Sequence, residues 1–99
     1  MIRGTTPTHT FKTDISLLDC TVVYLTYKQN GSKIVEKTKE DLTITEDQVV
    51  VTLSQKETLG FEEGVTVEIQ FRVGFADGSR AASNIMSAPV KRILKDGII

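Results

Sequence analysis

Apolar and polar residues alternate with a period of two along much of this chain. The clearest run is Val65–Phe75, in which every second residue is apolar. Side chains of a strand point alternately to its two faces, so this run predicts a long strand with one face in a core. Cys20–Lys28 is apolar on both faces (Val23, Leu25 and Tyr27 against Val22, Tyr24 and Thr26). That pattern predicts a central strand whose second face is partly covered.

Three dipeptides between these runs predict tight hairpins: Asn30-Gly31, Glu46-Asp47 and Asp77-Gly78. Asn30-Gly31 is the strongest of them, because both residues tolerate the positive φ of a type I′ turn. The predicted hairpins join Cys20–Lys28 to Ser32–Thr38, a brief strand at Leu42 and Ile44 to Gln48–Ser54, and Val65–Phe75 to Ser79–Val90.

Two segments carry a proline that keeps them from the middle of a sheet. Proline cannot donate to a strand ladder, so Pro7 predicts an edge strand at Thr6–Lys12 and Pro89 predicts another at Ser79–Val90. Unpaired edges of this kind can accept a strand from a partner.

Two connections break the strand pattern. Asp14–Asp19 reads as a short loop anchored by Ile15, Leu17 or Leu18. In Gln55–Gly64 we expect one helical turn at Lys56–Leu59, with Leu59 and Phe61 closing an open end of the core.

Composition agrees with the pattern. Val, Ile and Thr occupy 32 of the 99 positions, which favours strands over helices. About seven short strands with regularly spaced turns predict an all-β fold, an antiparallel two-sheet β-sandwich. We expect a single domain over residues 1–99, with an ordered core over about 5–93 and a flexible C-terminal tail over 94–99.

From Val22 onward the layout resembles the fibronectin type III and immunoglobulin-like β-sandwich families. VVYLTYKQNGSKIVEK is similar to a hairpin of the four-stranded sheet, and VTLSQKETLGFEEGVTVEIQFRV to a strand, a crossover and a long strand. FADGSRAASNIMSAPV is similar to the last hairpin. The chain departs from the families in having no Trp, in having Val65 or Val67 where a corner Tyr is expected, and in having room for only one strand in Met1–Asp19. A reduced or rearranged sandwich is therefore expected.

The whole chain also resembles small proteins encoded among the structural genes of phages and prophages of Gram-positive bacteria. The opening MIRGTTPTHTF, the hairpin YKQNGSKIVEKT, the crossover LSQKETLGF and the ending RILKDG carry this resemblance. It implies a virion or tail-assembly context and no chemistry. The opening residues lack a secretory signal, so we expect synthesis in the cytoplasm, and no apolar run is long enough to cross a membrane.

Charge and reactive residues argue against catalysis. Twelve Lys plus Arg against thirteen Asp plus Glu give a net charge of −1, which is not that of a nucleic-acid binder. His9 is the only histidine and is expected to be solvated, and the lone Cys20 is expected to be a buried hydrophobe. The paired carboxylates Glu40-Asp41, Glu46-Asp47 and Glu62-Glu63 are expected to be solvated turn charges rather than a glycosidase pair or a calcium site. We therefore expect no enzyme, cofactor or metal.

Two features remain for binding. Tyr24 and Val22 lie on the face opposite the predicted core; this face is either an exposed apolar platform or packed beneath a neighbouring loop. The tail carries apolar residues beyond the predicted core, which either belong to a flexible end or dock on another subunit: Ile93, Leu94, Ile98 and Ile99.

The sequence thus favours a non-enzymatic protein-interaction or structural module, a phage or prophage virion or tail-associated component. Its partners would be proteins or copies of itself, bound through edge strands or the C-terminal tail, and neither nucleic acid nor membrane. The alternative is a carbohydrate-binding module that uses an exposed sheet face around Tyr24.

Overall fold

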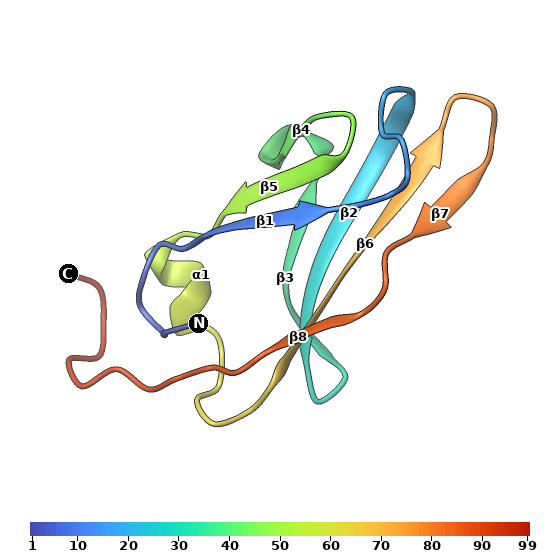
Figure 1. Cartoon of the computed structure of the whole chain (residues 1–99). Helices are drawn as coiled ribbons and strands as arrows, with labels where there is room; N and C mark the ends of the chain where they lie inside the picture. The colour runs from blue at the N-terminus through green and yellow to red at the C-terminus, as the bar shows by residue number, and fades with distance from the viewer.

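A computed structural model describes all 99 residues and arranges the strands in two antiparallel sheets (Figure 1). The strands are β1 (Thr8–Lys12), β2 (Cys20–Gln29), β3 (Ser32–Thr38), β4 (Thr43–Ile44), β5 (Gln48–Thr52), β6 (Val67–Phe75), β7 (Arg80–Ala82) and β8 (Met86–Ala88). A 3₁₀ turn at Lys39–Asp41 and the short helix α1 (Gln55–Leu59) are the helical elements. The prediction of an all-β chain is confirmed.

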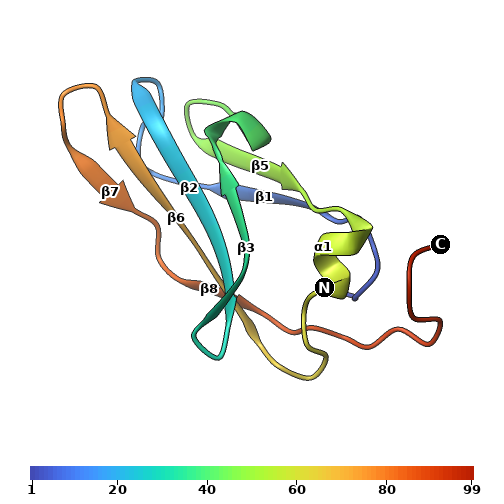
Figure 2. The same cartoon turned by 180° about the vertical axis from the view of Figure 1, so that it is seen from behind.

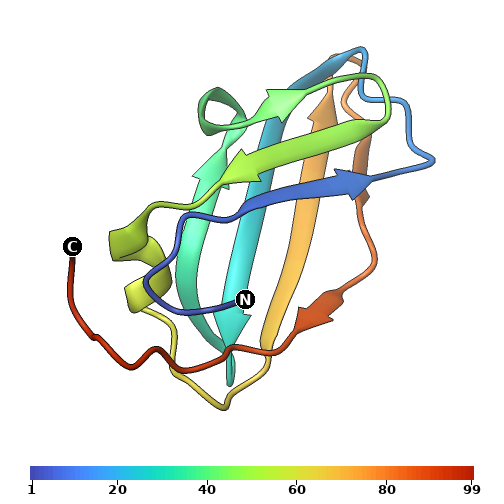
Figure 3. The ribbon, with the colours of Figure 1, turned by 60° about the vertical axis from the view of Figure 1, so that its left-hand side comes forward.

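One sheet has three strands in the order β1-β5-β4, and the other has β3-β2-β6 with both β7 and β8 on the outer edge of β6. All strand pairs within the sheets are antiparallel. Figures 1 and 2 show the two sheets from opposite sides, and in Figure 3 β1 and β5 cross in front of β2 and β6. The predicted edge positions of the first strand and of the returning last strand are confirmed.

The space between the sheets is filled by a single cluster of 15 buried apolar residues. Burial of this apolar surface is the main favourable term for the fold. Three strands contribute most of it, with inward residues at every second position: Val23, Leu25 and Tyr27 from β2, Val49 and Val51 from β5, and Val67, Ile69, Phe71 and Val73 from β6. The period-two pattern thus predicted both the strands and their buried faces.

The three hairpins form at the predicted dipeptides. Asn30 and Gly31 have φ values of 49° and 79°, the left-handed conformation that this turn requires and that glycine adopts without strain. β4 and β5 meet across Glu46-Asp47, and β6 and β7 meet across Asp77-Gly78. The helical turn expected at Lys56–Leu59 is also present, beginning one residue earlier.

Two strands are shorter than the pattern predicts. β6 begins at Val67 rather than Val65. The register with β2 places Val65 opposite the Asn30-Gly31 turn, beyond the end of β2, and its carbonyl accepts a hydrogen bond from the Gln29 side chain. The return strand is broken into β7 and β8 around Ser83. There the Ser83 hydroxyl accepts the Phe71 N–H, and the Gln70 amide donates to the Ser83 carbonyl. Side chains therefore replace part of the regular backbone pairing.

Both termini lie on the side of the molecule that carries α1 (Figures 1 and 2). Ile2 forms a parallel bridge with Lys91, and Arg3 donates to the carbonyls of Leu59 and Phe61. The loop before β2 is anchored by Leu17, while Leu18 is exposed. No helix has the length and hydropathy required to cross a bilayer.

Candidate functional site

The outer face is the surface of the five-stranded sheet that points away from the core. Its residues alternate with the buried ones along β2 and β6 and pair across the two strands: Val22 with Gly74, Tyr24 with Arg72, Thr26 with Gln70, and Lys28 with Glu68. On β3, Lys33 pairs with Lys28 and Glu36 with Thr26. The strand register thus arranges the outer face as four rows of side chains.

Tyr24 lies open on this face, with 45% of its surface exposed. Of the two expectations for this side of β2, the structure supports the exposed platform and not the packing beneath a loop. Val22 is half-buried instead, because it packs over its cross-strand neighbour Gly74, which has no side chain. A Cβ atom built on Gly74 would lie only 2.6 Å from a methyl carbon of Val22. The apolar part of the platform is therefore Tyr24 together with Ile85, which is 60% exposed.

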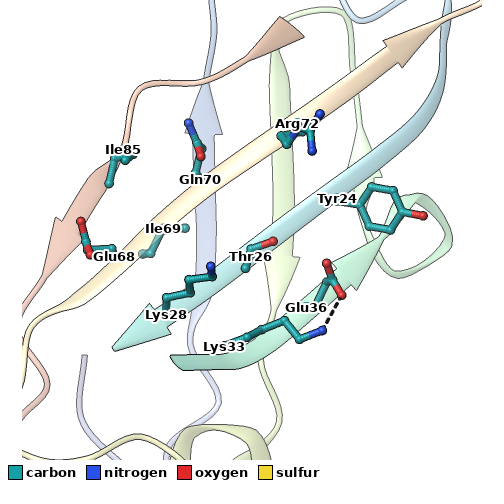
Figure 4. Close-up of a pocket in the computed structure, with 10 residues that line it drawn as sticks. All are labelled: Tyr24, Thr26, Lys28, Lys33, Glu36, Glu68, Ile69, Gln70, Arg72 and Ile85. Carbon is teal, nitrogen blue, oxygen red and sulfur yellow. Dashed lines mark hydrogen bonds and ion pairs between the residues drawn. The ribbon is translucent and has the colours of Figure 1, made fainter. Parts of the chain in front are cut away.

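The outer face is hollowed into an open depression of about 540 Å³ (Figure 4). Tyr24, Thr26 and Lys28 rise from β2 beside Arg72, Gln70 and Glu68 from β6. At the rim, Lys33 Nζ and Glu36 Oε2 form an exposed ion pair of 3.0 Å. The depression therefore offers one aromatic ring, several hydrogen-bonding groups and charges of both signs.

At the α1 end of the molecule, polar groups are buried and paired with one another. The hydroxyl of Tyr27, a fully buried residue, shares a 2.7 Å hydrogen bond with Nδ1 of His9. Burial and the nearby Met1 ammonium lower the pKa of His9, while burial and the charge of Glu57 raise the pKa of Tyr27. The expectation of a solvated His9 is therefore wrong: β1 turns this side chain inward, onto the aromatic ring of Tyr27.

Glu57 joins α1 to β3 at the same end. Its carboxylate accepts the Ser54 N–H in a capping box and meets Lys37 Nζ at 2.7 Å. Burial alone would raise the pKa of Glu57, but the bonds from Lys37 and Ser54 outweigh it, and the pKa of Glu57 is lowered. Because these groups already satisfy one another, they are suited to stabilising the fold rather than to binding substrate.

Gln29 ends β2 and holds the crossover loop before β6. It is 4% exposed, its amide donates to the carbonyls of Glu62 and Val65, and its oxygen accepts the Glu62 N–H. Sequence reasoning missed this residue, as it missed the pairing of His9 with Tyr27. The only signal available was that Gln29 follows Tyr27 by two residues and therefore shares its inward face.

The free edge of β1 carries unpaired backbone groups. The Leu53 N–H donates to the Pro7 carbonyl, and the Thr13 N–H donates to the Asp47 carbonyl. In an antiparallel ladder such pairs alternate along the strand, so Thr8, Thr10 and Lys12 direct their N–H and C=O groups away from β5. No strand pairs with that side of β1.

The four apolar residues expected in the tail separate into two groups. Ile93 is half-buried and packs near Gly4 and Leu59. Leu94, Ile98 and Ile99 project into solvent, with exposures of 89%, 66% and 91%. The structure thus leaves the last three available to a partner and uses Ile93 internally.

Cys20 and the carboxylates of the turns are the remaining candidate reactive groups. Cys20, at the start of β2, is buried and free, as expected. The chain contains no group of three or more His, Cys, Asp or Glu side chains placed closely enough to hold a metal ion. The Asp77 carboxylate accepts both the N–H and the hydroxyl of Ser79, bonds that lower the pKa of Asp77 and hold the turn.

Comparison with known proteins adds no relative: no family model, curated protein or solved structure matches the chain.

Proposed function

We propose that this chain is a non-enzymatic protein-interaction or structural module, a virion- or tail-associated component of a phage or prophage. The resemblance of its opening, hairpin and crossover sequences to phage structural-region proteins supports the context. The free β1 edge supports the mode of action, because backbone groups that lack a strand partner accept an extended segment of another protein.

We further propose that the two sheets are a reduced immunoglobulin or fibronectin type III sandwich. In the immunoglobulin fold, strands A, B, E and D form one sheet and C, F and G the other, with C′ added beside C in variable domains. The orders β1-β5-β4 and β3-β2-β6-β7 correspond to B-E-D and C′-C-F-G. In this correspondence β1 is strand B, and the position of strand A beside it holds no strand of this chain.

The free edge of β1 is the observation that carries the proposal. Its outward groups are the N–H and C=O pairs of three alternate residues, Thr8, Thr10 and Lys12. The side chains between them point inward: Phe11 packs against the core, and His9 stacks on Tyr27. A partner strand placed there would complete the three-stranded sheet without moving the core. The exposed Leu94, Ile98 and Ile99 supply a second contact of apolar character.

Thr10→Pro tests this edge, with Thr10→Val as its matched control. Proline removes the outward N–H of Thr10 while leaving the inward ladder intact, whereas valine keeps that N–H. We expect complexes with the products of the neighbouring genes, measured by co-expression and light scattering, to survive Thr10→Val and to be lost in Thr10→Pro. Equal binding by both variants, or no complex with any neighbouring product, would contradict the proposal.

The open depression around Tyr24 favours one alternative, a carbohydrate-binding module. An exposed aromatic ring beside Thr26, Gln70 and Arg72 could stack on a sugar while the polar groups bond to its hydroxyls. A glycan array with the native chain and Tyr24→Ala tests it. Binding that Tyr24→Ala abolishes supports this alternative, and an array without signal, or equal binding by the variant, removes it.

A further inference from the structure

The outer face of the five-stranded sheet carries charges whose order along β6 makes the face complementary to itself. Arg72, Gln70 and Glu68 occupy three successive outward positions of that strand. Arg72 and Glu68 lie four residues apart, which is about 13 Å along a strand. We propose that this face binds a second copy of the chain in a two-fold symmetric dimer.

The symmetry axis would lie in the plane of the face, perpendicular to β6, and pass near Gln70. Rotation by 180° about this axis keeps each strand above its own copy and reverses the order of the rows. Arg72 of one copy then faces Glu68 of the other, and the second Arg72–Glu68 pair follows from the symmetry. A single strand thus supplies two intermolecular ion pairs.

The neighbouring strand β2 fits the same operation. Tyr24 pairs with Arg72 and Lys28 with Glu68 across the two strands, so the rotation places Tyr24 over Lys28 of the second copy. An ammonium above an aromatic ring is attracted by the ring's quadrupole. Thr26, in the row of the axis, meets its own copy and is uncharged, so no repulsion arises at the centre.

Glu36 on β3 also lies in the row of the axis, where two carboxylates could repel. Each is neutralised within its own chain by Lys33, whose Nζ lies 3.0 Å from Glu36 Oε2. The edge strand therefore brings together two neutral ion pairs rather than two negative charges.

The apolar part of the face supplies the remaining driving force. Tyr24 and Ile85 are 45% and 60% exposed, and both line the depression that a second copy would cover. Four rows on four strands span roughly 20 Å by 15 Å, given the spacings of residues and strands in sheets. This footprint is smaller than that of a standard protein interface, so the expected dimer is weak.

This inference goes beyond the proposed function, because it uses the sheet opposite the β1 edge. It also predicts that the two surfaces act independently. Thr10→Pro is expected to leave the dimer intact, and charge changes on the outer face are expected to leave partner binding at β1 intact.

Charge reversal and its rescue test the dimer on the full chain. Arg72→Glu and Glu68→Arg each place two like-charged pairs across the interface, while the double variant restores both attractive pairs in reversed order. Both residues are exposed, and circular dichroism checks that each variant folds. Sedimentation equilibrium from about 10 µM to about 1 mM covers the affinities of weak complexes.

We expect the native chain to form dimers, each single reversal to raise the dissociation constant by about tenfold or more, and the double variant to return it to within about threefold of native. A native chain that stays monomeric throughout overturns the inference, whether or not the face then binds a glycan. The inference is also overturned if neither single variant changes the dissociation constant of the dimer, or if the double variant does not recover the native value.

Discussion

Two polar regions of this protein use the same residue types in opposite ways. On the outer face, Tyr24, Gln70 and Glu36 are exposed or half-buried and surround an open depression. At the α1 end and its adjoining loops, which we call the closed end, Tyr27, Gln29 and Glu57 are covered and bonded to neighbouring groups. Polar groups that are covered and satisfy one another stabilise the fold, whereas those that stay exposed to solvent can also meet a partner.

Each residue type therefore provides its own matched comparison. The comparison pairs two glutamines, two tyrosines and two glutamates, one of each at the closed end and one on the outer face. If the closed end is structural, substituting its residue will lower the free energy of unfolding much more than substituting the outer-face residue of the same type. If the outer face is for binding, its members will affect association and leave stability almost unchanged.

The glutamine pair has the largest expected difference. Gln29→Ala removes three hydrogen bonds and leaves the Glu62 N–H and two carbonyls without that partner, so we expect a loss of about 2–4 kcal/mol. Gln70→Ala removes one bond to the Ser83 carbonyl and should cost less than about 1 kcal/mol. Urea unfolding of both variants measures the two values, and similar losses would show that the two regions do not differ as we argue.

The contrast also explains which parts of the fold could be predicted from the sequence. The period-two run of β6 and the turn chemistry of Asn30-Gly31 are local signals, and both led to the correct elements. The break at Ser83 depends on a serine hydroxyl that meets Phe71 across the hairpin, a long-range contact that no local pattern records.

The candidate site was predicted in the same uneven way. Alternation placed Tyr24 on the face opposite the core, but whether a loop covers that face depends on where the other sheet and the connections lie. The contact between His9 and Tyr27 at the closed end was harder still to predict. β1 and β2 belong to different sheets, so these two side chains meet only once the two sheets have packed together. A lone histidine among threonines gives no sign of such a contact.

The tyrosine pair has the next largest expected difference. Tyr27→Phe keeps the buried ring but leaves Nδ1 of half-buried His9 without its 2.7 Å partner, which we expect to cost about 1–2 kcal/mol. Tyr24→Phe removes a hydroxyl that contacts solvent and should change stability by less than about 0.5 kcal/mol. Thermal unfolding followed by circular dichroism compares the two. A loss at Tyr24 as large as at Tyr27 would mean that the outer face is structural as well.

The glutamate pair has the smallest expected difference at neutral pH. Glu57→Gln weakens a capping box and a partly buried ion pair and should cost about 1 kcal/mol at pH 7, against about 0–0.5 kcal/mol for the exposed Glu36→Gln. Glu36 accepts its bond from Lys33, which lies three residues away on the same strand. Substituting Glu36 therefore breaks no contact between different elements. Urea unfolding at pH 7 gives both values.

The pH dependence of the Glu57 effect identifies its source. Because the pKa of Glu57 is lower in the folded chain than in the unfolded chain, the unfolded chain binds more protons as the solution is acidified. The stabilisation by ionised Glu57 is therefore complete above the unfolded pKa and is lost as the pH falls through the folded pKa. Native protein and Glu57→Gln should converge in stability when urea unfolding is repeated at progressively lower pH. A gap that persists at low pH would assign the effect to packing of the side chain instead of its charge, and would place the closed end nearer to an ordinary core than to an ionic network.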